Sequence, residues 1–133
     1  MKNFKVGDTA SVSKTISEAD IIAFAEISGD HNPLHLDAEF AAHSRFGQRI
    51  AHGALVSSLI SNVIGNQLPG QGSIYLSSSL KFRAPTFIDD TITATATISS
   101  IREDKPVFVL SCVCRNQRGE IVCQGESVVL YEP

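Results

Sequence analysis

The segment ISGDHNPLHLD, residues 27–37, places two acids, two histidines, an asparagine and a proline within one short stretch. A carboxylate and an imidazole can together accept and deliver protons near neutral pH, so a paired Asp and His is typical of general acid–base catalysis. Asp30 and His35 are the candidate pair. In a fully extended chain they would lie roughly 16 Å apart, at about 3.3 Å per residue. The pair therefore requires a bend between them.

Pro33 can supply this bend. Proline has no backbone N–H and disfavours helical angles at the residue before it, here Asn32. Asn followed by Pro predicts a β-turn from Asn32 to His35, which holds its first and fourth residues within about 7 Å. Such a turn can bring His35 back toward Asp30. The alternative is that Asp30 and Asn32 only cap and turn the backbone, as both residue types often do.

A metal site is the competing interpretation of the same stretch. His31 and His35 are four residues apart, and Asp37 lies nearby. That spacing gathers two ligands only on a helix, and Pro33 lies between the histidines. No second cluster of His or Cys completes a zinc-binding set. We therefore expect no metal.

The second candidate stretch is RIAHGAL, residues 49–55, where Gly53 begins a predicted helix. The first N–H groups of a helix lack internal partners and carry the positive end of the macrodipole. A glycine there lets a ligand approach the backbone, so its amide could stabilise a carbonyl oxygen that becomes an oxyanion. The alternative is that Gly53 is only a helix-start residue. We interpret His52 as a packing residue and assign it no chemistry.

The first half of the chain has the pattern of helices. Ser17, followed three residues later by Asp20, resembles a capping box with Asp in place of the usual Glu. The apolar residues that follow fit a helix of about eleven residues ending near Gly29. Asp37 could cap a short helix over residues 38–43. These helices flank the segment that carries Asp30 and His35.

A third helix is predicted from Gly53 to near Gly65, and its wide apolar stripe predicts burial on most sides. From Gly72 onward the pattern changes to strands with short turns. A long buried helix and a run of antiparallel strands predict a single α+β domain over residues 1–133, with the sheet wrapped around the helix. An exposed strand edge would favour dimerisation. The predicted strands lie in SIYLSSSLKFRA, TITATATISSI, PVFVLSCVCRN and EIVCQGESVVLY, with one more over residues 9–16.

Two details of these strands can be tested. The stretch SIYLSSSLKFRA predicts one face made of alternate residues, and Gln117-Arg118-Gly119 predicts a hairpin turn. The alternate residues are Ile74, Leu76, Ser78, Leu80 and Phe82.

The composition excludes several classes of protein. Hydrophobic residues make up 43% of the 133 residues and charged residues 19%, which is typical of a soluble globular protein. The formal net charge of -3, with scattered basic residues, predicts no nucleic-acid partner. No apolar run reaches the roughly 20 residues that span a bilayer, and the first residues have no secretory signal. Three cysteines, all in predicted strands, indicate buried thiols and a cytoplasmic location rather than a disulfide framework.

The sequences SGDHNPLHLD and FGQRIAHGAL together resemble the MaoC-like, R-specific enoyl-CoA hydratases, which have the hot-dog fold. The family pattern is Gly-Asp-x-Asn-Pro-x-His-x-Asp, followed later by Phe-Gly and Ile-Ala-His-Gly. The stretch KFRAPTFIDDTI is similar to the family strand that ends in Phe-Arg-x-Pro. The family usually has Gly-Asp where this chain has Asp89-Asp90, which puts the local turn in doubt.

The resemblance implies an antiparallel hot-dog sheet around a central helix and reversible hydration of short- to medium-chain trans-2-enoyl-CoA to (R)-3-hydroxyacyl-CoA. Asp30 and His35 would form the catalytic dyad, and the Gly53 amide would polarise the thioester carbonyl. Asn32 would order the loop or the acid, and Ser61 would line the acyl pocket. No cofactor is implied, because CoA enters as part of the substrate. Members form homodimers, some of which assemble further.

Two other functions remain open. Hot-dog proteins include thioesterases, whose usual catalytic carboxylate lies on the central helix, yet the predicted helix here contains no Asp or Glu. The other alternative is a non-catalytic acyl-CoA-binding module or a structural subunit of a dehydratase complex. The sequence does not show which member of the dyad is the base, nor whether acyl carrier protein could replace CoA.

Overall fold

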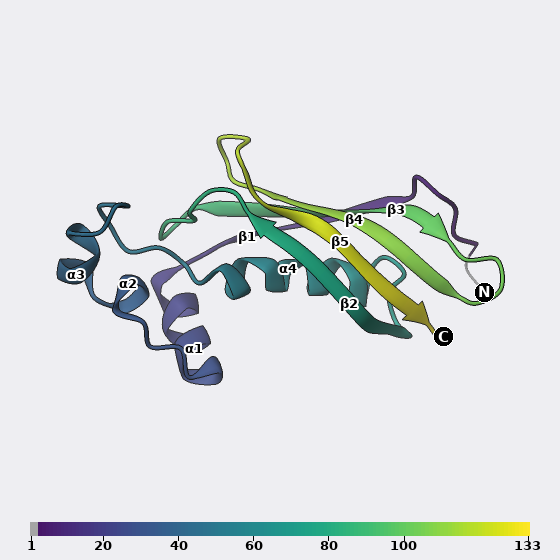
Figure 1. Ribbon diagram of the computed structural model, residues 1–133, viewed down its shortest axis with the longest axis horizontal. Helices are drawn as coiled ribbons and strands as arrows, with labels where there is room; N and C mark the ends of the chain where they lie inside the picture. The colour runs from purple at the N-terminus through teal and green to yellow at the C-terminus, as the bar shows by residue number, and fades with distance from the viewer. Residues whose placement is uncertain (1–2) are drawn as a thin grey trace.

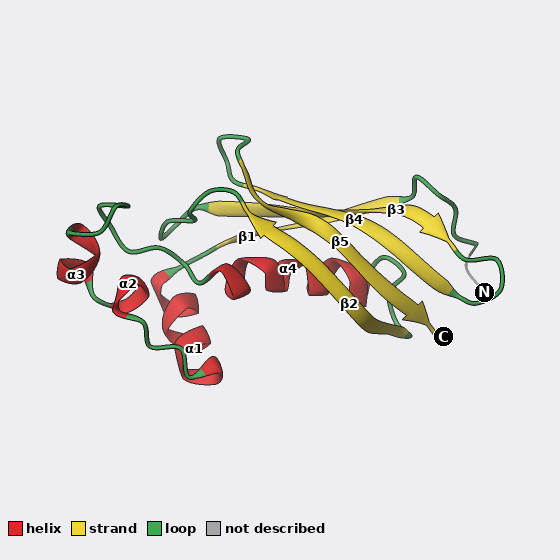
Figure 2. Ribbon diagram, in the orientation of Figure 1, coloured by secondary structure: helices red, strands yellow, loops and turns green. Residues whose placement is uncertain are grey.

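The computed structural model describes residues 3–133 and contains one five-stranded antiparallel sheet in the order β1-β3-β4-β5-β2. The helices lie on one side of this sheet, with α4 running along it and the shorter helices beyond one of its ends (Figures 1 and 2). This confirms the α+β hot-dog architecture predicted from the sequence. The strands are β1 (Thr9–Thr15), β2 (Ser73–Phe82), β3 (Thr91–Ile101), β4 (Val107–Arg115) and β5 (Ile121–Tyr131). The helices are α1 (Glu18–Ser28), α2 (Pro33–Leu36), α3 (Ala38–Ala42) and α4 (Gly53–Asn66).

Strand β3 shows why this sequence forms a sheet. Its β-branched residues alternate with small ones, and every second side chain is buried along most of its length. The other face pairs hydroxyls with β1, with Ser11 bonded to Thr95 and Ser13 to Thr93, each at 2.7 Å. The buried face packs against α4. The predicted turn at residues 117–119 also forms, because Gly119 adopts the left-handed φ of 81° between β4 and β5.

Helix α4 packs on the sheet through one stripe, which contains Val56, Leu59, Ile60, Val63 and Ile64. Its opposite side is exposed, so the prediction that this helix is buried on most sides is wrong for the single chain. The sheet covers only one face of α4, so the other face of this 14-residue helix is open to solvent. Within residues 3–133, no helix has the length and apolarity required to cross a membrane.

Strand β2 differs most from the predicted pattern. A β-bulge between Tyr75 and Ser77 shifts the register against β5, so the alternation does not continue through Leu76. Leu76 and Phe82 are exposed, and only Leu80 among the predicted face is packed against the core. The strand has a neighbour on one side only, so its other edge is unpaired. The predicted alternation of these residues on one face is therefore interrupted at the bulge.

Capping residues define the start and the end of α1 and the start of α3. Ser17 and Asp20 form a reciprocal capping box at the start of α1, which ends at Gly29 with a φ of 79°. Asp37 accepts a hydrogen bond from the Phe40 amide at 3.1 Å and caps α3. These caps confirm the predicted ends of both helices.

The segment after α1 differs from the structure predicted for it. Residues 32–35 were predicted to form a β-turn, and its backbone hydrogen bond is present, but the bend belongs to the four-residue helix α2, which starts at Pro33 with Asn32 as its N-cap. The His35 amide donates to the Asn32 carbonyl at 3.0 Å, as the turn required. Proline is well suited to the first helical position, because its missing N–H has no intrahelical partner there. The same sequence signal therefore produced a helix start rather than a free turn.

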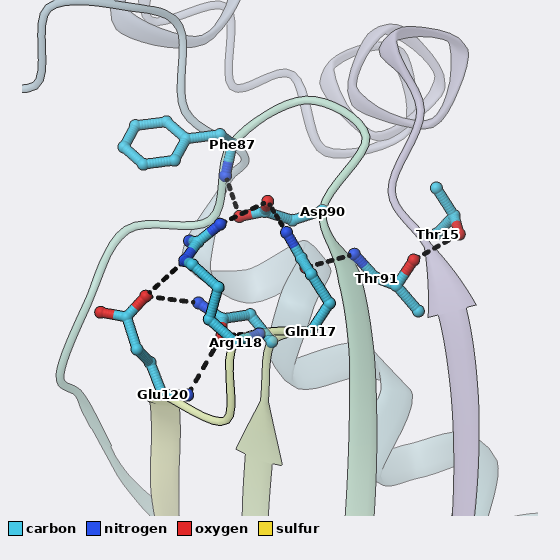
Figure 3. A network of polar contacts seen from close by, with 8 residues as sticks. Thr15, Phe87, Asp90, Thr91, Gln117, Arg118 and Glu120 are labelled. Carbon is cyan, nitrogen blue, oxygen red and sulfur yellow. Dashed lines mark hydrogen bonds and ion pairs between the residues drawn. The ribbon is translucent and has the colours of Figure 1, made fainter.

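The Asp89-Asp90 pair forms an ordered turn despite its departure from the family pattern. Asp89 has a φ of 70°, the left-handed region that glycine adopts easily and that Asp tolerates better than most residues. The buried Asp90 carboxylate accepts hydrogen bonds from the Phe87 amide at 2.9 Å and from the Gln117 side chain at 2.7 Å. Arg118 lies 3.6 Å from the same carboxylate (Figure 3). This network holds the loop between β2 and β3.

That loop reaches the start of α4. The Ala51 amide donates to the Thr86 carbonyl at 2.7 Å, and Ile50 forms an isolated antiparallel bridge with Phe87. The backbone that precedes Gly53 is thereby attached to the sheet. The position of the helix N-terminus follows from this contact.

We predict that Asp20→Asn weakens the fold in a pH-dependent way. Hydrogen bonds from Ser17, with a further contribution from Lys14, lower the pKa of the Asp20 carboxyl. Its charged form therefore stabilises the fold above its ordinary pKa, and this contribution is lost as the pH falls through the lowered value. At pH 7 we expect the variant to lose about 0.5–1 kcal/mol of unfolding free energy. Urea unfolding at pH 7 and at pH 3 measures this. An equal loss at both pH values would contradict the explanation.

Candidate active site

The fold brings the Asp30 carboxylate and the His35 imidazole together. The left-handed Gly29 ends α1 and turns the chain, and α2 then carries His35 back toward Asp30. One ligating atom from each of Asp30, His35 and His52 lies within 4.8 Å of the other two. A single water molecule can contact an acid and an imidazole at such a separation.

Backbone hydrogen bonds order the loop that carries Asp30. The Asn32 amide donates to Oδ1 of Asp30 at 3.1 Å, which fixes one oxygen of the carboxylate. The Asn32 side-chain oxygen accepts from the Leu34 amide at 3.0 Å, and the Ser28 hydroxyl accepts from the Asp30 amide at 3.1 Å. Asn32 therefore contacts both the acid and the start of α2. The geometry suits the loop-ordering role expected for it.

His35 is only 8% exposed, and its ring is fixed by the segment that leads to α4. Its Nδ1 lies 2.8 Å from the Ile50 carbonyl. A carbonyl oxygen can only accept, so Nδ1 carries the proton and the neutral ring keeps a lone pair on Nε2. Arg49, which the sequence reasoning missed, donates to the His35 carbonyl at 2.7 Å and pairs with Glu18 at 2.9 Å. These contacts attach α2 to α1.

His52 is the second residue that sequence reasoning missed. It is 2% exposed, and its Nε2 donates to the Asp30 carbonyl at 3.1 Å. Its ring lies 3.9 Å from that of His35, with a 31° angle between the planes, and 4.8 Å from that of Phe24. Its buried Nδ1 has no partner within residues 3–133. The interpretation of His52 as packing alone is incomplete, and only its position before Gly53 could have indicated more.

His31 does not join this cluster. It is exposed and pairs with Glu26 at 3.2 Å, which raises the pKa of His31. The cluster instead contains His52, whose ring lies against that of His35 at a tilt. Asp30, His35 and His52 are close enough to be considered as metal ligands, so the expectation of no metal stays a prediction.

Gly53 begins α4 next to this pair. The first amides of the helix have no intrahelical acceptors, and its N-cap residue, His52, makes no side-chain cap hydrogen bond. A Cβ on Gly53 would lie only 2.9 Å from Cε1 of Phe82, so a larger residue would require the exposed Phe82 ring to shift. Gly53 therefore keeps both a free amide and close access to it.

A cleft of about 520 Å³ opens beside His35 and the start of α4. His35 and Gly53 lie in its wall, and most of the remaining lining is apolar, with two arginines. The apolar and small residues are Phe46, Ile50, Ala51, Val56, Phe82, Ala84, Pro85, Thr86 and Val122, and the arginines are Arg45 and Arg83. Such a cleft fits a long organic substrate that presents a reacting carbonyl to Gly53.

Ser61 lies apart from this cleft. It is on the exposed side of α4, two turns beyond Gly53, and does not line the cleft of this chain. Its expected role in the acyl pocket stays a prediction. The structure therefore brings together Asp30, His35 and Gly53, with Asn32 close by, and leaves Ser61 on another surface.

Comparison with known proteins gives consistent results. Residues 5–111 match the family described as MaoC like domain. The chain is 45% identical to the (R)-specific enoyl-CoA hydratase of Aeromonas caviae, over 96% of each chain. It is 43% identical to the (R)-specific enoyl-CoA hydratase of Rhodospirillum rubrum, over 97% of this chain and 89% of that one.

Among solved structures, the (R)-hydratase from A. caviae involved in PHA biosynthesis superimposes with a TM-score of 0.96 at 44% identity. The match covers 99% of this chain and 100% of that chain. The agreement extends over both sequence motifs and the whole sheet. The chain belongs to the MaoC-like domain family.

Proposed function

We propose that this protein is an (R)-specific enoyl-CoA hydratase, which adds water reversibly to short- to medium-chain trans-2-enoyl-CoA. The observation that carries the proposal is the approach of Asp30 to His35, which shares the wall of a cleft with Gly53. The relatives named (R)-specific enoyl-CoA hydratase support the reaction and its stereochemistry. The product is the (R)-3-hydroxyacyl-CoA.

The thioester carbonyl would lie against the N-terminus of α4. Attack of water on C3 of the enoyl group moves electron density onto the carbonyl oxygen. The Gly53 amide donates to this oxygen, and the positive end of the helix macrodipole lies at the same place. Removal of one such donor commonly costs about 10²–10³ in rate. Gly53 thus stabilises the enolate that the addition creates.

The Asp30–His35 dyad would handle the protons. The hydroxyl of water adds to C3, and a proton adds to C2, so the dyad must both accept a proton from water and deliver one to carbon. Because His35 donates Nδ1–H to Ile50, its Nε2 is the nitrogen that exchanges protons. The Asp30 carboxylate faces the same water, with Oδ1 oriented by the Asn32 amide.

We propose that the protein assembles as a homodimer joined through β2. This strand lies at the edge of the sheet, and an unpaired edge can add a strand from a second copy. Exposed apolar side chains accompany the edge, namely Ile74, Tyr75, Leu76 and Phe82. Pairing there would cover these side chains and extend the sheet.

A specific observation disfavours thioester hydrolysis. Helix α4, with the sequence GALVSSLISNVIGN, contains no carboxylate that could attack or activate water there. A non-catalytic acyl-CoA-binding module is disfavoured by the ordered contacts that orient both members of the dyad.

We predict that Asp30→Asn and His35→Ala each lower kcat by about 10²–10⁴-fold, because each removes one group of the proton-transfer pair. The decay of enoyl-thioester absorbance measures kcat, and circular dichroism checks that the variants are folded. The Ser61→Ala variant, changed on the exposed side of α4, is measured in the same assay to test the predicted contact of Ser61 with the acyl chain. Near-native turnover in a folded dyad variant would contradict the assignment.

We predict that Gly53→Pro lowers kcat by about 10²–10³-fold relative to Gly53→Ala. Both substitutions add a Cβ against the Phe82 ring, but only proline removes the amide proton. Proline is tolerated at the first position of a helix, and His52 already has the extended angles that proline requires of its predecessor. Equal kcat values for the two folded variants would assign the loss to crowding and exclude the amide role.

We predict that crotonyl-CoA loses its enoyl absorbance in the presence of the enzyme without release of thiol. A thiol reagent in a parallel assay distinguishes hydration from hydrolysis, and chiral chromatography identifies the 3-hydroxyacyl product. Release of free CoA in proportion to the absorbance change would establish the thioesterase alternative. Binding of acyl-CoA without either change would establish the non-catalytic one.

A further inference from the structure

Two arginines that line the cleft, and a lysine in a neighbouring hollow, are not used by the proposed mechanism. Within residues 3–133, Arg45, Lys81 and Arg83 form no ion pair with an acid, whereas Arg49 and Arg102 each do. The net charge of the chain is -3, so a local group of three unpaired cations is not a consequence of a basic protein. Unpaired cations beside a cleft are typical of a site for an anionic ligand.

Arg45 and Arg83 lie at the cleft that contains His35 and Gly53. Both arginines are exposed, whereas His35 is buried, so the cleft leads from His35 toward a positively charged surface. Its volume of about 520 Å³ lies within the range of pockets that hold substantial organic ligands. The cleft therefore has room for more than a short acyl group.

Arg83 also borders a second hollow, of about 370 Å³, on the outer face of the sheet. Lys81 lies in this hollow, and the registers Ser79–Glu126 and Lys81–Gln124 place the lining side chains of β2 and β5 on one face. With its amide oxygen facing Arg83, Gln124 accepts hydrogen bonds from Nε and Nη2 at 3.1 Å each. Arg83 thus stands between the two hollows and is held by a neutral partner.

Coenzyme A matches this arrangement of charge. Its pantetheine arm is uncharged and ends at the thioester, a diphosphate follows, and the ribose carries a further 3′-phosphate. Guanidinium groups bind phosphate oxygens through paired hydrogen bonds, and lysine acts as a point charge. A CoA thioester that reacts at His35 would lead its phosphates out of the cleft toward these cations.

We infer that Arg45 and Arg83 bind the diphosphate of the CoA substrate and that Lys81 binds its 3′-phosphate in the outer hollow. The inference rests on the proposed function for the position of the thioester. Glu126 also borders the outer hollow, and the phosphate must lie on the Lys81 side of it. A phosphopantetheine arm on a carrier protein has one phosphate and no 3′-phosphate, so Lys81 would favour CoA over a carrier protein.

Three crotonyl thioesters separate these contacts. Crotonyl-CoA carries all three phosphates, crotonyl-dephospho-CoA lacks the 3′-phosphate, and crotonyl-pantetheine lacks every phosphate. We expect Arg45→Ala and Arg83→Ala each to raise KM by about tenfold or more for both nucleotide substrates, as loss of a charged hydrogen bond does. We expect Lys81→Ala to raise KM for crotonyl-CoA and to remove most of the wild-type KM difference between crotonyl-CoA and crotonyl-dephospho-CoA.

Arg102→Ala is the matched control, because Arg102 is exposed and pairs with Asp104 away from both hollows. It should leave KM for all three substrates within about twofold of the wild-type value. If an Arg45 or Arg83 variant raises KM for crotonyl-pantetheine as much as for crotonyl-CoA, the residue shapes the cleft and does not bind phosphate. An unchanged KM for crotonyl-CoA would overturn the inference for the residue concerned.

A binding measurement separates failure of this inference from failure of the proposed function. Isothermal titration of wild-type and variant protein with free CoA and dephospho-CoA requires no turnover. Weaker CoA binding in the three variants, with wild-type binding in Arg102→Ala, supports the phosphate site even if no hydration is observed. Unaltered CoA affinity in all three variants rejects the site even if the hydratase is active.

Discussion

The hydrogen bond from the buried His52 imidazole to the Asp30 carbonyl is the contact that joins the two halves of the candidate site. Asp30 lies on the loop after α1, whereas His52 immediately precedes α4. Because the bond fixes the backbone of Asp30, it sets the distance between the acid and the helix N-terminus. The tilted contact between the rings of His52 and His35 also attaches α2, which carries His35, to the same junction. The reacting groups are thus placed by buried contacts, although Asp30 itself is exposed.

The same junction constrains protonation. Both imidazoles donate one N–H to a backbone carbonyl, so each neutral ring has a defined tautomer. His35 lines the cleft, whereas Nδ1 of His52 is buried without a partner among residues 3–133. His35 is therefore the imidazole placed to meet a substrate, and His52 is placed to support the Asp30 backbone.

The sequence was informative where local rules decide structure. The caps at Ser17, Gly29 and Asp37, the start of α4 at Gly53 and the hairpin turn before Gly119 follow from residue types alone. The dyad could be proposed because Asp30 and His35 are near in sequence. His52 could not, because its contact with Asp30 spans 22 positions and depends on how α1 packs beside α4. The burial of α4 was overestimated for a related reason: apolar patterning does not say whether the same chain or another copy supplies the covering surface.

The distribution of charge explains how a chain with a net charge of -3 could bind a polyanionic substrate. Several acidic residues elsewhere are paired: Glu18 pairs with Arg49, Asp90 lies near Arg118, and Asp104 pairs with Arg102. Arg45 and Arg83 beside the cleft have no acidic partner within residues 3–133, so they can attract an anionic ligand. The lining beside His35 and Gly53 is mostly apolar, which would strengthen a hydrogen bond to a developing oxyanion. Under the proposed function, the arginines of the same cleft would attract the phosphates, and the start of α4 would stabilise the developing charge.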